Sequence, residues 1–177
     1  MNARHVASAA LATMVLVMGG CSVTPEPEET TPAFATEEEA FAAAEQTYRA
    51  YVDALNQVDL SDPETFEPVF ALTTGELNTS DRRGLSTYHA DQVAKSGEST
   101  ITDLQRESAD LENGIIHFSV CLDVSTVELT ELSGESIVDP DRVPVQSLRV
   151  TVEGPRTAAG SLQVSSVSGR SGEPVCD

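Results

Sequence analysis

One stretch in the second half of the chain constrains the fold more than any other. In residues 115–125, every second side chain is apolar, and this face holds Ile116, Phe118, Val120, Leu122 and Val124. The opposite face is half polar, with Ile115, His117, Ser119, Cys121 and Asp123. A period of two is the pattern of a β-strand with one buried face. We therefore expect a strand that packs one face on helices and leaves the other for solvent or another segment.

Helical periodicity precedes this strand. Thr36 and Glu39 form a capping box, and steps of three and four predict a helix over residues 37–57. Its apolar face would hold Phe41, Ala44, Tyr48, Tyr51, Val52 and Leu55. Asp62 and Pro63 open a short second helix. A third helix is predicted over residues 80–95, with Gly97 just past its end.

Further strands follow the helices. Residues 100–110, 145–153 and 161–168 fit strands, and Glu112-Asn113-Gly114 is a hairpin turn. Residues 126–144 are expected to form a hairpin with an acidic tip. Helices followed by antiparallel strands predict the α+β class, with N-terminal helices packed on a curved antiparallel sheet. The length fits one such domain, over residues 36–177.

The N-terminus has the features of a lipoprotein signal peptide. Arg4 precedes an apolar run of about 13 residues, shorter than the roughly 20 that cross a membrane, and the run ends at Met18-Gly19-Gly20-Cys21. This lipobox predicts removal of residues 1–20 and attachment of lipid, palmitate included, to Cys21. Leu is commoner than Met at the third position before the cysteine. The alternative is an ordinary secretory cut that leaves Cys21 as a free thiol.

The segment after the lipobox and the overall charge limit which kinds of partner are possible. Residues 21–35 are dominated by Pro, Glu and Thr and are predicted to form a disordered acidic tether. The chain carries a formal net charge of −19, which disfavours binding to nucleic acid. We expect an extracytoplasmic protein that is held at the cell membrane by its lipid.

Cysteine arithmetic supports a disulfide. If Cys21 carries lipid, Cys121 and Cys176 remain as a pair, and such a pair usually bonds in an oxidising compartment. The bond would close a loop of about 55 residues and stabilise the fold by roughly 4 kcal/mol. It would also draw the tail over the polar face of the strand at 115–125. The alternative is two free, buried thiols.

These features together resemble a known family. The lipobox, the acidic tether, the helix segment from Ala44 to Tyr51, the strand with Cys121 and the terminal Cys176 look like actinobacterial lipoproteins with a nuclear-transport-factor-type, cystatin-like roll. The resemblance spans residues 36–176. It implies a curved sheet that wraps the first helix around a conical pocket, with Tyr48, Tyr51, Tyr88 and Phe118 as candidate lining. Aromatic rings on a helix stripe are, however, more often core residues than ligand contacts.

The residues offer little catalytic chemistry. Roll enzymes similar to ketosteroid isomerase use an acidic base beside a tyrosine, but the inward strand faces hold only Ile, Phe, Val and Leu. No serine elbow, phosphate loop or zinc spacing occurs. His89 and His117 are expected to be exposed or simply hydrogen-bonded, and Asp139-Pro140-Asp141 lacks EF-hand spacing. We assign no catalytic residue, metal ligand or cofactor.

The leading hypothesis is a non-catalytic lipoprotein that binds a small apolar ligand or an envelope protein. A roll filled by its own side chains and serving in protein contact is an alternative. A ketosteroid-isomerase-like enzyme that uses a tyrosine-lined cone is another. An open cone with tyrosine and a buried carboxylate would favour the enzyme. A filled cone with an exposed apolar patch would favour the partner module.

Overall fold

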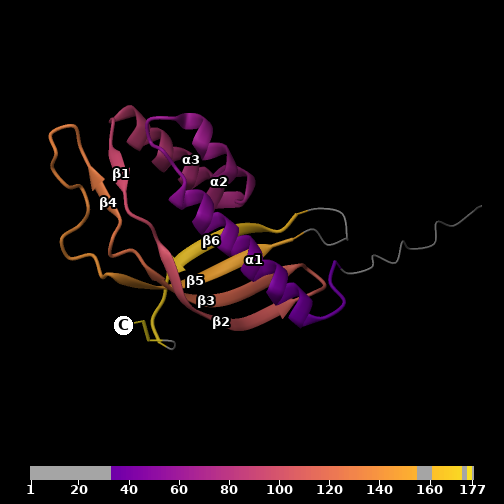
Figure 1. Ribbon diagram of the computed structural model, residues 1–177. Coiled ribbons are helices and arrows are strands. Elements are labelled where there is room, and N and C mark those ends of the chain that lie inside the picture. Colours follow the sequence, from indigo (N-terminus) through magenta and orange to yellow (C-terminus); the bar gives the residue numbers. More distant parts are fainter. Residues whose placement is uncertain (1–32, 155–160, 173–174, 177) are drawn as a thin grey trace, which may run out of the picture.

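The computed structural model describes residues 33–154, 161–172 and 175–176. Its helical part precedes its strands (Figure 1), in the order α1 (Glu37–Asn56), the 3-10 helix η1 (Pro63–Phe66), α2 (Glu67–Ala71) and α3 (Gly75–Ala90). The strands are β1 (Ala94–Ser96), β2 (Thr100–Asp110), β3 (Ile115–Asp123), β4 (Glu128–Thr130), β5 (Val145–Glu153) and β6 (Gln163–Gly169). The predicted α+β class is confirmed.

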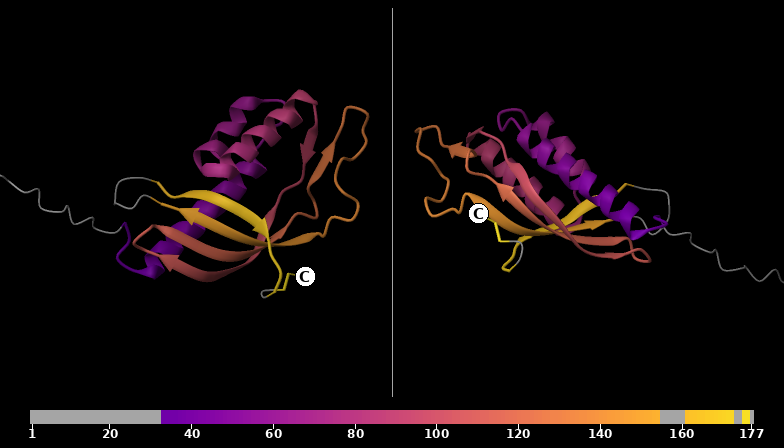
Figure 2. Two further views of the ribbon diagram at one scale, coloured as in Figure 1. Left: turned by 180° about the vertical axis from the view of Figure 1, so that it is seen from behind. Right: turned by 60° about the horizontal axis from the view of Figure 1, so that its bottom comes forward.

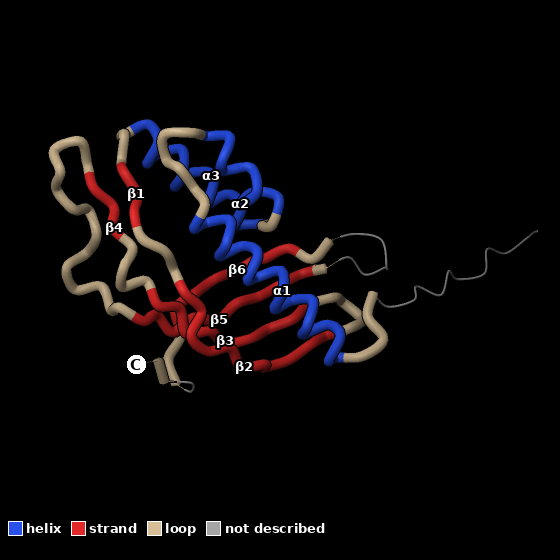
Figure 3. The backbone as a smooth tube through the Cα atoms, viewed as in Figure 1, coloured by secondary structure: helices blue, strands red, loops and turns tan. Residues whose placement is uncertain are grey.

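The main sheet is antiparallel with the order β2-β3-β5-β6. It curves beneath α1, which crosses one face diagonally, as both views of Figure 2 show. The short strands β1 and β4 form a separate pair. We call β1, β4 and residues 131–144 the arm, which projects beside α3 (Figure 3). The arrangement is the predicted roll of helices on a curved sheet.

The first helix begins where the capping box places it. The Thr36 side chain accepts a hydrogen bond from the Glu39 amide, 3.2 Å away, and the Glu39 carboxylate accepts one from the Ala35 amide at 3.1 Å. These bonds satisfy amides that have no partner inside the helix. Phe34 packs against the core, so the contacts of the roll begin two residues before the predicted domain start.

The third helix is shifted from its predicted range of 80–95. It runs from Gly75 to Ala90 and ends in a Schellman motif. Gln92, at φ 56°, takes the left-handed position, the Gln92 amide donates to the His89 carbonyl and the Val93 amide to the Tyr88 carbonyl. The prediction placed the end of the helix just before Gly97, whereas Gln92 takes the left-handed position that ends it. Gly97 therefore follows β1 and not the helix.

The arm contains both a missed strand and a confirmed hairpin. Lys95, predicted to be helical, lies in β1 opposite Leu129 of β4. The chain turns back near Gly134, since the Ile137 amide donates to the Leu129 carbonyl. Thr130 also forms a bridge with Ser136. The predicted hairpin within residues 126–144 is thus present, but β4 pairs outward with β1 as well.

The core lies between α1 and the sheet. The alternation in β3 is confirmed, because Ile116, Phe118 and Val120 are at most 1% exposed. Neighbouring strands and α2 supply valines that are fully buried, namely Val150, Val152, Val164 and Val69. Along the described ranges, no helix is both long and apolar enough to span a bilayer.

The predicted disulfide between Cys121 and Cys176 is present. The two residues are 55 positions apart in sequence, and their Cα atoms lie 5.4 Å apart. Cys121 shares the outer face of β3 with Ser119 and His117, so the bond fastens the tail beyond β6 to the face that α1 does not cover. Cys21, the signal peptide and most of the tether lie outside the described residues.

Candidate functional site

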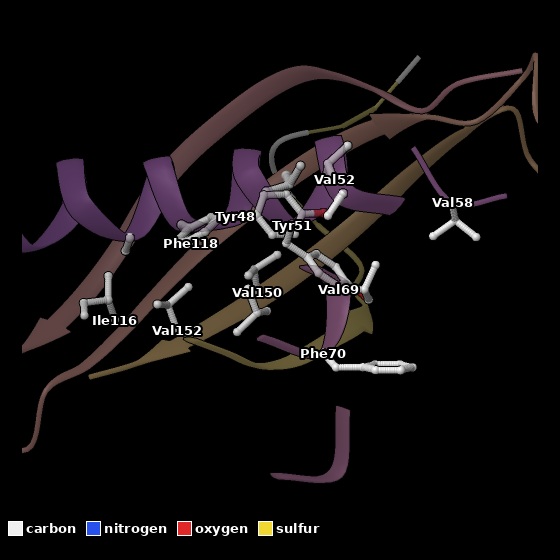
Figure 4. Close-up of a cluster of buried hydrophobic side chains, with 14 of the residues drawn as sticks. Tyr48, Tyr51, Val52, Val58, Val69, Phe70, Ile116, Phe118, Val150 and Val152 are labelled. Atoms are coloured by element: carbon white, nitrogen blue, oxygen red, sulfur yellow. The ribbon is translucent and has the colours of Figure 1, made fainter. Parts of the chain in front are cut away.

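The space under α1 is filled with side chains. Tyr48 of α1 and Phe118 of β3 are each 1% exposed and meet edge to face, with ring centroids 5.6 Å apart. Tyr51 lies next to Tyr48 at 6.1 Å, and Figure 4 shows the three rings among the valines of the sheet. Three of the four candidate lining residues are therefore part of the core. Within the described residues, the centre of the roll holds packed rings where the resemblance implied a cone.

The structure reveals a carboxylate beside these rings that the sequence reasoning missed. The Tyr51 hydroxyl donates to the Asp81 carboxylate of α3, with oxygen–oxygen distances of 3.2 and 3.4 Å. Loss of hydration raises the pKa of Asp81 to about 6, although the Tyr51 hydrogen bond opposes this rise. Burial also raises the pKa of both Tyr48 and Tyr51. The pKa of Asp81 therefore lies closer to neutral pH than that of an exposed aspartate.

A signal for Asp81 did exist in the sequence. Leu77, Asp81 and Leu85 follow one another at steps of four, which places them on one face of a helix. A carboxylate on an apolar stripe has to face the protein. The Tyr51–Asp81 pair lies at the junction of α1 and α3, and neither residue lines any of the five pockets described for this part of the chain.

Both histidines of the roll are hydrogen-bonded, as expected. His89 Nδ1 lies 2.8 Å from the Leu60 carbonyl, and His117 Nδ1 lies 3.0 Å from the Thr151 hydroxyl. His89 lines a pocket of about 380 Å³ together with Lys95. The Lys95 ammonium donates to the Asn56 carbonyl at 3.1 Å, and burial lowers the pKa of Lys95. The two hydrogen bonds at this pocket connect α3 to the loop after α1 and β1 to the end of α1.

The outer face of the sheet carries a polar network. The Ser119 hydroxyl donates to Glu107, and Glu107 pairs with Arg149 at 3.0 Å. The bond from Ser119 and the nearby Arg149 lower the pKa of Glu107. Ser119 is 2% exposed. Glu107 occupies an irregularity between Arg106 and Ser108 in β2, and sequence alternation gives no warning of such an insertion.

Several surface pockets border the arm and the last strand. Tyr88, the fourth candidate lining residue, faces a pocket of about 390 Å³ with Leu132 and Ile137 of the arm. A second pocket, of about 530 Å³, lies between the start of α3 and β6, and a third of about 540 Å³ continues past the end of β6. These hollows lie on the outside of the roll, away from the tyrosine core.

Comparison with known proteins gives fold-level similarity only. No protein-family model matches the chain, and no curated relative does. The structure is similar to Aln2 from a Streptomyces species, at 15% identity over 74% of this chain and 90% of that one, with a TM-score of 0.43. A putative aromatic ring hydroxylase from Novosphingobium aromaticivorans is 12% identical over 77% and 96%, with a TM-score of 0.47.

A third similar structure is a protein of unknown function with a cystatin-like fold from Methylobium petroleophilum. It is 14% identical over 77% of this chain and 82% of that one, with a TM-score of 0.34. At such low identities these proteins assign no activity to this chain.

Proposed function

We propose that the chain is a membrane-anchored extracytoplasmic lipoprotein whose roll domain is a non-catalytic module for binding an envelope protein at its surface. The filled interior is the observation that carries the proposal. A ligand inside the roll would need the volume that Tyr48 and Phe118 occupy, and each of these rings is only 1% exposed. A partner would therefore bind to the outer surface of the roll.

Exposed apolar side chains support a protein partner over a small molecule. Leu132 of the arm is 76% exposed and Ile137 39%, while Val143 and Val175 are 60% and 64% exposed. Isolated apolar residues are common on surfaces, but grouped ones mark contact sites. Leu132 and Ile137 line the same hollow. The net charge of −19 disfavours a partner whose contact surface is strongly acidic as a whole.

The anchor is tested separately from the partner. Cys21→Ala in the full chain should move the protein from the membrane fraction to the medium, because the lipid attachment is lost. A Cys121→Ala chain is the matched control and should stay with the membrane. Retention of the Cys21→Ala chain in the membrane fraction would contradict the anchor.

The partner is tested by photo-crosslinking in the host. A photoreactive residue at Leu132 or at Ser168, both exposed, should give a discrete crosslinked protein, whereas the same group at exposed Asp53 of α1 should not. Native mass spectrometry of the purified chain provides the opposing arm. A stoichiometric small apolar molecule, with no crosslinked protein, would overturn the proposal in favour of an internal ligand.

The Tyr51–Asp81 pair is the one observation that favours a roll-fold enzyme instead. The oxygen–oxygen distance of 3.2 Å places a proton donor beside a carboxylate, the combination that ketosteroid-isomerase-like chemistry needs. For that reading, the roll would have to open beside Tyr51. Slow proton exchange of the Tyr51 hydroxyl in the absence and presence of steroid-like ketones would exclude such opening.

A further inference from the structure

The last strand of the sheet has an edge that is only partly covered. β6 pairs with β5 on one side, and on its other side the segment before α3 pairs with it at a single point. There, the Val164 amide donates to the Leu72 carbonyl and the Thr74 amide donates to the Val164 carbonyl. This parallel bridge between Thr73 and Val164 begins a fifth strand. Gly75, at φ 59°, then turns the chain away from the edge into α3.

Beyond this bridge the backbone of β6 points outward. The Arg170 amide donates to the Ser147 carbonyl, which fixes the hydrogen-bonding phase of the antiparallel pair. Because bonded and non-bonded pairs alternate, Ser168 and Ser166 face β5, while Val167 and Gly169 direct their amides and carbonyls away from it. Among the described residues, no strand pairs with β6 at these two positions.

A groove lies along this open edge. The pocket of about 530 Å³ is walled by Leu77 and Ser80 of α3 on one side and by Ser165, Ser166 and Val167 on the other. The pocket of about 540 Å³ continues it along Ser168, Gly169 and Arg170. Figure 2, left, shows β6 as the outer strand of the sheet, with α3 beside it. A helix beside a free strand edge is the setting in which an extended peptide adds to a sheet.

The two edge strands of the sheet, β2 and β6, differ in how well they are protected against the addition of another strand. β2 is interrupted by two irregularities and carries Asp103, Arg106 and Glu107, and bulges and charges discourage strand addition. β6 has one irregularity, before Ser166, and then reads Ser-Ser-Val-Ser-Gly without a charge. Beside β6, the larger pocket is also lined by Glu76 and Glu153, and the positive charges of Arg149 and Arg170 line the hollow at the far end.

From these observations we infer that β6 accepts an extended polypeptide of the partner as a fifth strand, parallel to β6, with an acidic side chain near Arg149 and Arg170. This inference rests on the proposed function and names the partner's chemistry. The bound strand continues the line that Leu72 to Thr74 begins. Its backbone bonds with Val167 and Gly169, and its acidic residue meets the arginine end of the groove, at the exposed side chain of Arg149 beside Glu107.

The test uses the isotope-labelled full chain and a capped hexapeptide, Thr-Val-Thr-Val-Thr-Asp. At saturation the peptide should slow hydrogen exchange of the Val167 and Gly169 amides at least tenfold. The same peptide N-methylated at alternate residues cannot form the strand bonds and should give no slowing. A version ending in Lys should bind at least fivefold more weakly. Unchanged exchange with the Asp peptide would overturn the inference.

Two further outcomes are decisive. Val167→Pro removes one outward amide and should abolish the slowing, whereas Ser168→Ala leaves the edge intact and should not; the N-methylated peptide serves the same purpose if Val167→Pro does not fold. Slow exchange of both amides before any peptide is added, with a dimer in sedimentation, would overturn the inference in favour of a second copy. Crosslinks from Leu132 but not from Ser168 would leave the proposed function standing and reject the β6 site.

Discussion

The Tyr51 hydroxyl and the Asp81 carboxylate, 3.2 Å apart, join the first and third helices through a hydrogen bond whose acceptor has a raised pKa. The hydrogen bond is directional, but partial burial makes the charge on Asp81 unfavourable. The pKa of Asp81 is raised from 3.8 to about 6. We therefore expect the stability of the junction between α1 and α3 to depend on pH.

This relationship predicts the effect of Asp81→Asn. The protonated carboxyl stabilises the fold fully below pH 3.8, and that contribution is lost as pH rises through about 6. The amide keeps an acceptor for Tyr51 and removes the charge. We expect the variant to be about 1 kcal/mol more stable than wild type at pH 8, a figure reduced for partial exposure, and equal at pH 3.5. Urea unfolding at the two pH values measures this.

The control for this experiment is Asp53→Asn, on the exposed side of α1. It should leave the difference between the two pH values unchanged. A gain from Asp81→Asn that persists at pH 3.5 would show that charge is not its source.

Cys176→Ala should destabilise the roll by roughly 4 kcal/mol, because it opens the loop that the bond to Cys121 closes. Thermal unfolding without reductant measures the loss, with Cys21→Ala as the matched cysteine control. The intact mass of the wild-type chain should be about 2 Da below that of the reduced chain. Full alkylation of Cys121 in unreduced wild type would contradict the bond.

Phe118→Ala should cost about 3–5 kcal/mol, since it removes a ring that is 1% exposed and leaves a cavity against Tyr48. Leu132→Ala, at a side chain that is 76% exposed, should change stability by less than about 0.5 kcal/mol. Chemical denaturation of both variants provides the comparison. Near-equal losses would mean that the roll interior is not packed as described.

Gly97→Ala should destabilise the fold by at least about 2 kcal/mol more than Gly134→Ala. Both glycines have positive φ, 75° and 82°, so both alanines adopt a strained backbone. At Gly97 a Cβ would also overlap the backbone of Thr126, whereas at Gly134 it would meet open space. Denaturant midpoints of the pair isolate the clash, and equal midpoints would argue against the close approach.

The sequence predicted most of the fold because strict periodicities are strong local signals. Alternation from Ile115 onward and the Thr36 cap located the central strand and the first helix. The third helix was misplaced for two local reasons. Gly84 interrupts the helical pattern and obscures where the helix starts, and Gln92 takes a position that glycine usually occupies. A glycine inside a helix and a non-glycine cap are both tolerated through tertiary packing, which periodicity does not report.

The site was less predictable than the fold. Tyr48, Tyr51 and Phe118 were identified as inward residues, but whether they line a cavity or fill it depends on how closely α1 approaches the sheet. That distance is set by side chains from four strands and α2 together. The open edge of β6 depends on the turn at Gly75. This turn ends the pairing of Thr73 with Val164, a residue about 90 positions away in sequence.

The direction of α1 determines where the arm lies relative to the N-terminal tether. The helix has 20 residues and is therefore about 30 Å long. It starts at the end of the sheet where β2 and β3 turn, and the arm lies at the opposite end (Figure 1). A chain held by its N-terminus would use this helix as a rigid spacer. Leu132 and Ile137 would then lie about a helix length away from the point where the tether enters the roll.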